Sequence, residues 1–139
     1  MPNGGERPSV NDDDQIVADA SAVLALVKGE PFRGFDPRRI SGATVSAVNL
    51  SEILSTLAED GLTEQQVDAT ISPLELRIVA FDETQARDAA RLRSITKRLG
   101  LSLGDRACLA LARALKKPAA TADRAWSKLD IGAEIILIR

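Results

Sequence analysis

The sequence predicts an α/β domain built on a largely parallel sheet. Short apolar segments alternate along the chain with longer segments in which apolar residues recur at helical spacing. Most of the helical segments begin at Ser, Thr or Asp, which cap helix N-termini, and they stop at Gly or before Pro. Strands that alternate with helices in this way are typical of a parallel sheet whose strands are connected by helices.

The apolar segments are the expected strands, and the first and last of them have the composition of buried strands. They cover residues 16–18, 43–45, 76–81, 119–121 and 134–139. Helices are expected over 20–28, from Ser46 to near 61, from Thr63 to about 71, from Asp82 to about 100 and from Ser102 to about 117, with a short turn over 124–129. Capping boxes are expected at 63–66 and 82–85. Residues 29–42 are expected to form a loop with one irregular turn.

Length and composition predict one domain with a substantial core. The chain has 139 residues, of which 45% are hydrophobic. Residues 1–15 are polar and are expected to be a flexible tail, which leaves 16–139 as the domain. No apolar segment is long enough to span a membrane, and we expect no secretory signal, because the N-terminus lacks a basic segment followed by an apolar one. The single cysteine, Cys108, excludes a disulfide framework and is expected to be buried on a helix, so we expect a cytoplasmic protein.

The residue types present restrict the possible chemistry. The sequence contains no histidine. This excludes catalytic triads that use histidine, zinc sites built on imidazole ligands, and acid–base catalysis by imidazole. An enzyme with this composition must therefore use carboxylates, hydroxyls, Lys or Arg. Carboxylates together with water suit hard cations such as Mg²⁺ or Mn²⁺.

The net charge of −2 conceals an asymmetry between the two parts of the chain. Residues 1–84 contain 6 Lys and Arg against 15 Asp and Glu, whereas residues 85–139 contain 12 against 5. The basic second part is a candidate phosphate-binding surface, although ordinary solvated helix faces explain it equally well.

Four acidic residues lie at positions suited to a shared site. Asp19 and Asp123 each follow a predicted strand, where ligands bind in open α/β sheets. Glu52 lies in a largely apolar helical segment, and Asp105 opens the helix that begins after Ser102. Each has a structural alternative: Asp19, Asp105 and Asp123 as helix caps, and Glu52 at the rim of a buried stripe.

Taken together, the four acids predict a metal site. Strand ends and helix starts converge at one edge of a parallel sheet, so these carboxylates would repel one another there. Divalent cations, or protonation of one acid, would relieve the repulsion. Such a site is typical of a phosphodiester hydrolase in which one or two metal ions activate water and stabilise the leaving oxygen.

The motifs VADASAVLALV, SAVNLSEIL, GLSLGDRACLALA and TADRAW, followed by a last hydrophobic strand, resemble a PIN-domain ribonuclease of the VapC toxin type. The resemblance runs from about residue 16 to 139. It implies a three-layer α/β/α sandwich with a mostly parallel central sheet, and an acidic pocket that binds Mg²⁺ or Mn²⁺ and cleaves RNA. Matched motif by motif, the catalytic and metal-binding acids are Asp19, Glu52, Asp105 and Asp123.

The resemblance also suggests supporting residues and partners. Ser21 and Thr121 match hydroxyl positions beside the pocket, although a first-turn Ser and a strand Thr are equally natural there. Arg106 and Arg124 adjoin acids and are candidates to contact phosphate, with salt bridging or solvation as the alternative. The expected partners are an RNA substrate, a cognate antitoxin that covers the pocket and a second copy of the chain in a homodimer, with no membrane involved.

Other functions remain as alternatives. A catalytically degenerate PIN fold would bind RNA or a protein without cleavage. A phosphoacceptor or phosphohydrolase is disfavoured because Ser21, not an acid, stands two residues after Asp19, and nucleotide-binding glycine motifs are absent. Trp126 is either a packing residue or a stacking platform for a base or an antitoxin side chain. Residues 32–40, which match the family poorly, are candidates for substrate choice or partner contact.

Overall fold

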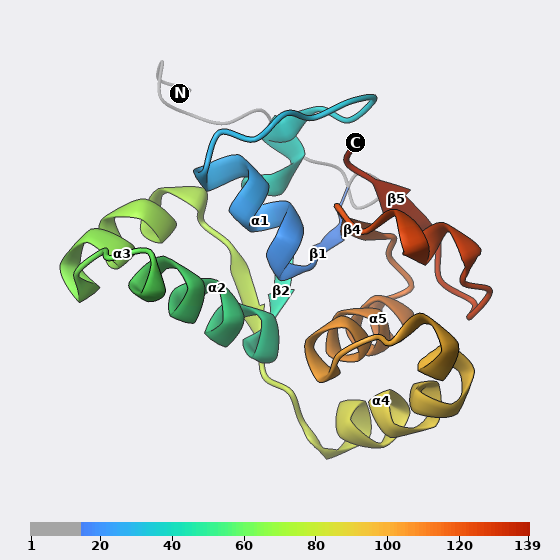
Figure 1. Cartoon of the computed structure of the whole chain (residues 1–139). Helices are drawn as coiled ribbons and strands as arrows, with labels where there is room; N and C mark the ends of the chain where they lie inside the picture. The colour runs from blue at the N-terminus through green and yellow to red at the C-terminus, as the bar shows by residue number, and fades with distance from the viewer. Residues whose placement is uncertain (1–14) are drawn as a thin grey trace, which may run out of the picture.

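The computed structural model describes residues 15–139 and confirms the α/β class (Figure 1). Five parallel strands form one sheet in the order β3-β2-β1-β4-β5. The strands are β1 (Val17–Ala18), β2 (Thr44–Ser46), β3 (Arg77–Val79), β4 (Ala119–Thr121) and β5 (Ile135–Leu137). Each overlaps one of the segments expected to be a strand. The predicted tail over 1–15 lies almost wholly outside the described residues.

The predicted helices are also confirmed. They are α1 (Ala20–Val27), α2 (Ala47–Glu59), α3 (Glu64–Ile71), α4 (Glu83–Thr96) and α5 (Leu103–Leu115), with 3-10 turns η2 (Pro37–Ile40), η3 (Ser72–Leu74), η4 (Lys97–Leu99) and η5 (Arg124–Lys128). The irregular turn expected within 29–42 is η2. In the described part of the chain, no helix has the length and apolar character needed to cross a membrane.

Side-chain caps explain where most of the helices begin. Thr63 and Gln66 form the predicted capping box of α3. Asp82 caps α4 through the backbone N–H of Gln85, at 2.9 Å. The second half of the capping box predicted there is wrong, because the Gln85 side chain donates instead to the carbonyl of Ala80, at 3.0 Å.

Alternate residues of the strands supply two separate cores. Ile16, Ala18 and Ala120 belong to a cluster with α1, α2 and α3, whereas Val17 and Ala119 belong to a cluster with α4, α5 and η5. Successive side chains of a strand point to opposite faces of the sheet, so helices cover both faces. The expected three-layer α/β/α sandwich is therefore confirmed, with the two groups of helices on either side of the sheet (Figure 1).

Burial varies across the sheet with strand position. The central strands β1, β2 and β4 are fully buried. The edge strand β3 is mostly exposed, and β5 is half-buried. The prediction that the last strand is buried is therefore only partly right, because β5 has a neighbour on one side only.

Two residues singled out in the sequence prove to be core residues. Cys108 is fully buried on α5, as predicted. Trp126 is fully buried in the cluster with α4 and α5, so the packing interpretation is the right one and its ring is covered.

In the segment 32–40, the rings of Phe32 and Phe35 stack with centroids 6.0 Å apart, and the Arg39 guanidinium lies 5.3 Å from the Phe35 centroid.

Truncating Trp126 should destabilise the fold strongly. Trp126→Ala is expected to lower the free energy of unfolding by about 3–5 kcal/mol, because it leaves a large cavity in the core. Trp126→Phe should cost only about 1–2 kcal/mol, since the indole Nε1 has no hydrogen-bond partner in the described structure to lose. Urea unfolding followed by circular dichroism measures both. Equal losses for the two variants would contradict the described packing.

Candidate active site

The candidate site lies where the connections of the sheet change direction. From β1 the chain runs to β2 and β3 on one side, then returns to β4 and β5 on the other. Ligands of open α/β sheets bind at such switch points, beyond the carboxyl ends of the strands. The register pairs Ala18 with Ala120, and this brings the following residues, Asp19 and Thr121, side by side.

Asp19 is a buried carboxylate held by three hydrogen bonds. Its exposed fraction is 3%. It caps α1: Oδ1 accepts from the N–H of Ala22 at 2.9 Å and from the Ser21 hydroxyl at 2.7 Å. Oδ2 accepts from the Thr121 hydroxyl at 2.6 Å. The capping role proposed as the alternative for Asp19 is thus real, yet the bonds from two other side chains show that the carboxylate does more than cap a helix.

The hydroxyls of Ser21 and Thr121 connect Asp19 to the segment after β4. Ser21 Oγ accepts from the N–H of Ala122 at 2.9 Å, and Thr121 Oγ1 accepts from the N–H of Asp123 at 3.0 Å. Each hydroxyl has one proton to donate, and both Ser21 and Thr121 donate it in a hydrogen bond to the Asp19 carboxylate. The two supporting hydroxyls predicted from the sequence therefore lie beside Asp19.

Burial raises the pKa of Asp19 to about 6 from an ordinary value of 3.8. The hydrogen bonds from Thr121, Ser21 and Ala22 oppose this rise because they stabilise the charged form, whereas the negative charge of Asp105 adds to it. A cation at this position would favour ionised Asp19.

Glu52 reaches the first turn of α5 from α2. The side-chain amide of Asn49 donates to Glu52 Oε1 at 2.9 Å and to the carbonyl of Gly104 at 3.0 Å. Asn49 is buried, with an exposed fraction of 1%. Neither Asn49 nor Gly104 was predicted to belong to the site. The available signals were a polar residue one turn before Glu52 and an isolated Gly inside a helical segment.

Asp105 combines a capping role with a place near the other acids. It is half-buried, and Oδ2 accepts from the N–H of Ser102 at 2.9 Å to complete the capping box of α5. The thiol of Cys108, one turn further along α5, has a pKa well above its ordinary value, mainly because it is buried. The negative charges of Asp19, Asp105 and Glu52 raise this pKa further, so all three carboxylates lie close enough to the thiol to act on it.

Asp123 lies at the exposed rim of this arrangement. Its Oδ1 accepts from the N–H of Ala125 at 2.9 Å and so caps η5, as the structural alternative proposed. Its backbone N–H donates to Thr121 Oγ1, which in turn donates to the Asp19 carboxylate. Within residues 15–139, none of the four acids forms an ion pair with Lys or Arg.

Both arginines proposed to contact phosphate are bonded to backbone carbonyls. Arg106 Nη1 donates to the carbonyl of Ala89 on α4 at 3.0 Å, and Arg124 Nη1 donates to the carbonyl of Arg139 at 3.1 Å. Arg106 thus links α5 to α4. Contact of either residue with phosphate stays a prediction.

The donors fit Mg²⁺ or Mn²⁺ in chemical type. They are carboxylate and hydroxyl oxygens, which hard cations prefer, and the charge of Asp19 is disfavoured by burial and by Asp105. In the described part of the chain, however, no three His, Cys, Asp or Glu side chains lie close enough together to hold a metal ion as they stand. Mg²⁺ usually retains several waters and takes only one or two carboxylates, so the arrangement fits such a water-rich site.

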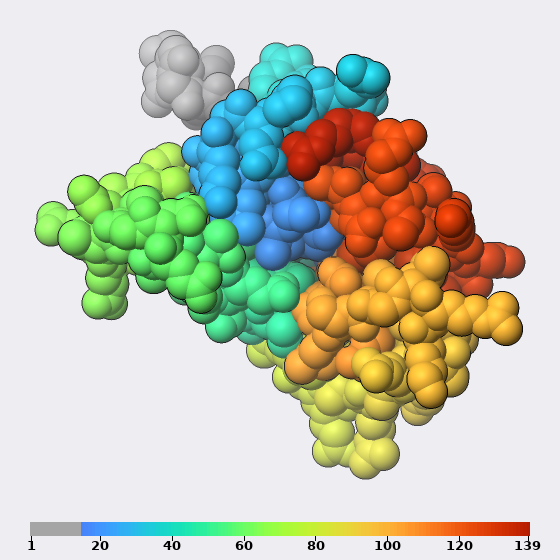
Figure 2. Space-filling model, viewed as in Figure 1, coloured from blue at the N-terminus to red at the C-terminus, as the bar shows by residue number. Residues whose placement is uncertain are grey.

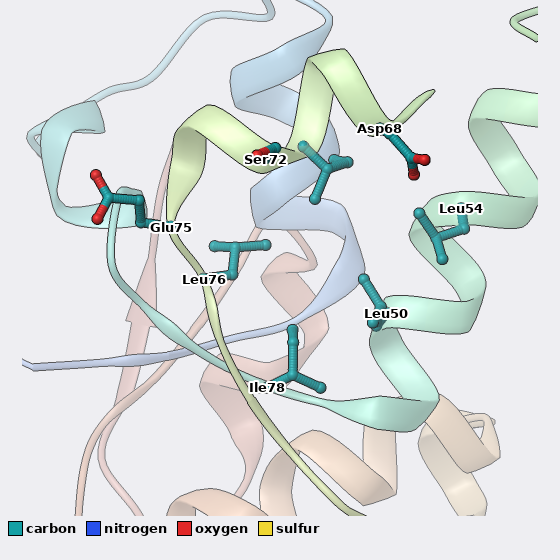
Figure 3. Close-up of a pocket in the computed structure, with 8 residues that line it drawn as sticks. Leu50, Leu54, Asp68, Ser72, Glu75, Leu76 and Ile78 are labelled. Carbon is teal, nitrogen blue, oxygen red and sulfur yellow. The ribbon is translucent and has the colours of Figure 1, made fainter. Parts of the chain in front are cut away.

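The segments that carry the four acids meet on one face of the molecule. In Figure 2 the blue start of α1, the teal start of α2, the orange start of α5 and the red-orange segment after β4 come together near the centre of the view. A separate cleft of about 450 Å³ lies between α2, α3 and β3 (Figure 3). It contains none of the four acids and is mostly apolar, lined by Leu50, Leu54, Asp68, Ile71, Ser72, Glu75, Leu76 and Ile78.

The fold and the site define a parallel α/β protein with a buried carboxylate at the switch point of its sheet and further acids near it. The model of the PIN domain family matches residues 16–132, and the chain belongs to that family. Among curated proteins, no significant sequence match was found.

Several solved structures have the same fold. The chain is similar to a chain of the DNA-bound VapBC complex from Salmonella typhimurium, with a TM-score of 0.69, 17% identity and coverage of 90% of this chain and 98% of that one. It is similar to VapC20 from Mycobacterium tuberculosis, described as a sarcin-ricin loop cleaving toxin. The TM-score is 0.64 and the identity 19%, with coverage of 81% of this chain and 92% of that one. It is also similar to a chain of VapBC-5 of the same organism, a member of the VapBC family of toxin–antitoxin systems. Here the TM-score is 0.59 and the identity 24%, with coverage of 91% of this chain and 98% of that one.

The raised pKa of Asp19 predicts a pH-dependent loss of stability in the metal-free protein. The folded chain binds this proton more tightly than the unfolded chain, so its contribution to stability is complete below about pH 4 and is lost as the pH rises through about 6. Asp19→Asn should therefore gain up to about 3 kcal/mol relative to the wild type between pH 4 and 7.5. Urea unfolding in EDTA at several pH values measures the difference. Parallel pH profiles for the two proteins would contradict the burial of Asp19.

Proposed function

We propose that the chain is a metal-dependent endoribonuclease that hydrolyses RNA phosphodiester bonds and acts as the toxin of a toxin–antitoxin pair. The observation that carries the proposal is the buried Asp19, with a raised pKa, at the switch point of a PIN domain and with Asp105 and Glu52 nearby. The toxin role draws on the VapBC complexes and on VapC20, the sarcin-ricin loop cleaving toxin, all of which share the fold. A protein of this kind would act in the cytoplasm.

The residues of the chain have distinct roles in the proposed reaction. Asp19, Asp105 and Asp123 would hold Mg²⁺ or Mn²⁺ directly or through water, and such an ion lowers the pKa of bound water and stabilises charge on phosphate. Ser21 and Thr121 fix the orientation of Asp19. Glu52 orients the attacking water and accepts its proton as the oxygen of the water bonds to phosphorus. The opposite P–O bond breaks, and the leaving oxygen takes up a proton from solvent water.

Exposed basic side chains near α5 are suited to hold the RNA backbone. Arg93, Lys97 and Arg98 are exposed at the end of α4 and in η4, which leads directly into the turn that carries Asp105. Phosphate contacts from Lys and Arg supply most of the sequence-independent affinity for nucleic acid. By contrast, Arg87 is paired with Glu83, and Arg113 with Asp88.

The proposed partners follow from the same comparison. A cognate antitoxin would cover the acidic pocket, and an Arg guanidinium suits that role because it pairs bidentately with a carboxylate. A homodimer is proposed as well. The alternative is a PIN domain that binds RNA or protein without cleavage.

Removing either proposed metal-binding carboxylate should abolish cleavage. Asp19→Asn and Asp123→Asn are each expected to reduce Mn²⁺-dependent RNA cleavage by about 100-fold or more, because each removes a charged ligand without changing the size of the side chain. Asp68→Asn, which changes an exposed carboxylate on α3, is the matched control and should retain full activity. Wild-type activity should vanish in EDTA and return with Mn²⁺. Full cleavage in EDTA would refute metal dependence, and no cleavage under any condition would favour the binding alternative.

Charge removal at η4 should weaken RNA binding without slowing the chemical step. The double variant Lys97→Ala/Arg98→Ala is expected to raise KM about 3- to 10-fold, to leave kcat unchanged and to flatten the dependence of KM on salt. Arg87→Ala serves as the control because its guanidinium already pairs with Glu83. Steady-state cleavage at several salt concentrations makes the comparison. An equal rise in KM for the control would show that these positions act only through overall charge.

A further inference from the structure

Gly104, in the first turn of α5, lies directly against the carboxylate of Glu52. A Cβ added to Gly104 would lie 2.5 Å from the carboxyl carbon of Glu52 and closer still to both of its oxygens. The backbone of Gly104 is helical, so no unusual conformation requires glycine there. Glycine inside a helix costs stability relative to alanine. The feature that requires glycine at this position is therefore the carboxylate beside it.

Asn49 fixes the same carboxylate from the other side. Its Nδ2 donates to Glu52 Oε1 at 2.9 Å and to the carbonyl of Gly104 at 3.0 Å, so one amide joins α2 to α5. Asn49 Oδ1 is buried and has no partner in the described structure, which is unfavourable for a buried acceptor. The stabilising contribution of Asn49 therefore comes from the bonds that its Nδ2 makes to Glu52 and Gly104.

We propose that Gly104 and Asn49 are positioning residues that hold Glu52 at the N-terminal turn of α5, next to Asp105. Glu52 Oε1 accepts a hydrogen bond from Asn49, whereas Oε2 makes no hydrogen bond within residues 15–139. Oε2 is therefore the oxygen that would orient the attacking water. The N-terminal end of a helix also favours a negative charge. This inference rests on the proposed ribonuclease function. It adds that Glu52 acts from one fixed position. A methyl group added at Gly104 would prevent the Glu52 carboxylate from occupying that position.

Stability measurements test the contact without relying on activity. Gly104→Ala is introduced into the wild type and into Glu52→Ala, and the urea midpoint is measured for all four proteins. In the Glu52→Ala background the methyl group has space, so alanine should raise the midpoint through its helix propensity. In the wild type the methyl group must displace the Glu52 side chain, so the midpoint should rise less or fall. Equal shifts in the two backgrounds would overturn the proposed contact.

Cleavage measurements test the positioning role. Gly104→Ala and Asn49→Ala should each lower kcat about tenfold or more while KM for RNA stays within about twofold, because the RNA contacts are untouched. In the Glu52→Ala background neither should cause a further loss. Leu103→Ala, which truncates the neighbouring half-exposed side chain of α5, is the matched control and should keep wild-type kcat.

The outcomes separate this proposal from the proposed function. A further large loss in the Glu52→Ala background would overturn the positioning role, since Gly104 would then act through the placement of α5 as a whole. If the wild type cleaves no RNA, the ribonuclease function fails and the catalytic part of the inference fails with it. The urea midpoints still decide whether Gly104 and Asn49 hold Glu52.

Discussion

The hydrogen bond between Asp19 and Thr121 is the interaction on which the site depends. It joins the ends of β1 and β4, which are adjacent in the sheet although about a hundred residues separate them in sequence. The second hydroxyl, from Ser21, ties the same carboxylate to the segment that leads to Asp123. The buried charge of Asp19 is thus held by groups from both sides of the switch point, and movement of β1 relative to β4 would break these bonds.

The order of the elements could be predicted from the sequence because local signals agree. Caps at Ser46, Thr63 and Ser102 define helix starts, and the alternation of apolar segments with helical ones predicts the parallel sheet. The exposure of the edge strands could not be predicted, since the order of strands in a sheet depends on contacts distant in sequence. The second half of the capping box at Asp82 failed because Gln85 found a nearby carbonyl as a competing partner.

The four acids illustrate the limit of sequence reasoning about a site. Motif order brought out Asp19, Glu52 and Asp105, and the charges of all three act on the buried Cys108 thiol in the structure. The sequence offered helix capping as the alternative to a site role for Asp19, Asp105 and Asp123. In the structure all three do cap helical segments, so structural and proposed catalytic roles share the same atoms. Asn49 and Gly104 were missed because their role is visible only once α2 and α5 are packed together. Their relation to Glu52 is one of distance, which single-sequence patterns do not encode.

The burial of Cys108 has a consequence for oxidative stress. This chain has one thiol, that of Cys108 on α5. It is fully buried, and burial together with the charges of three carboxylates disfavours the thiolate. Peroxides and disulfides react with thiolates that are exposed, so the folded chain offers them no accessible thiol and no route to a disulfide-linked dimer. Oxidants that inactivate thiol enzymes would thus leave Cys108 unaltered for as long as the chain stays folded.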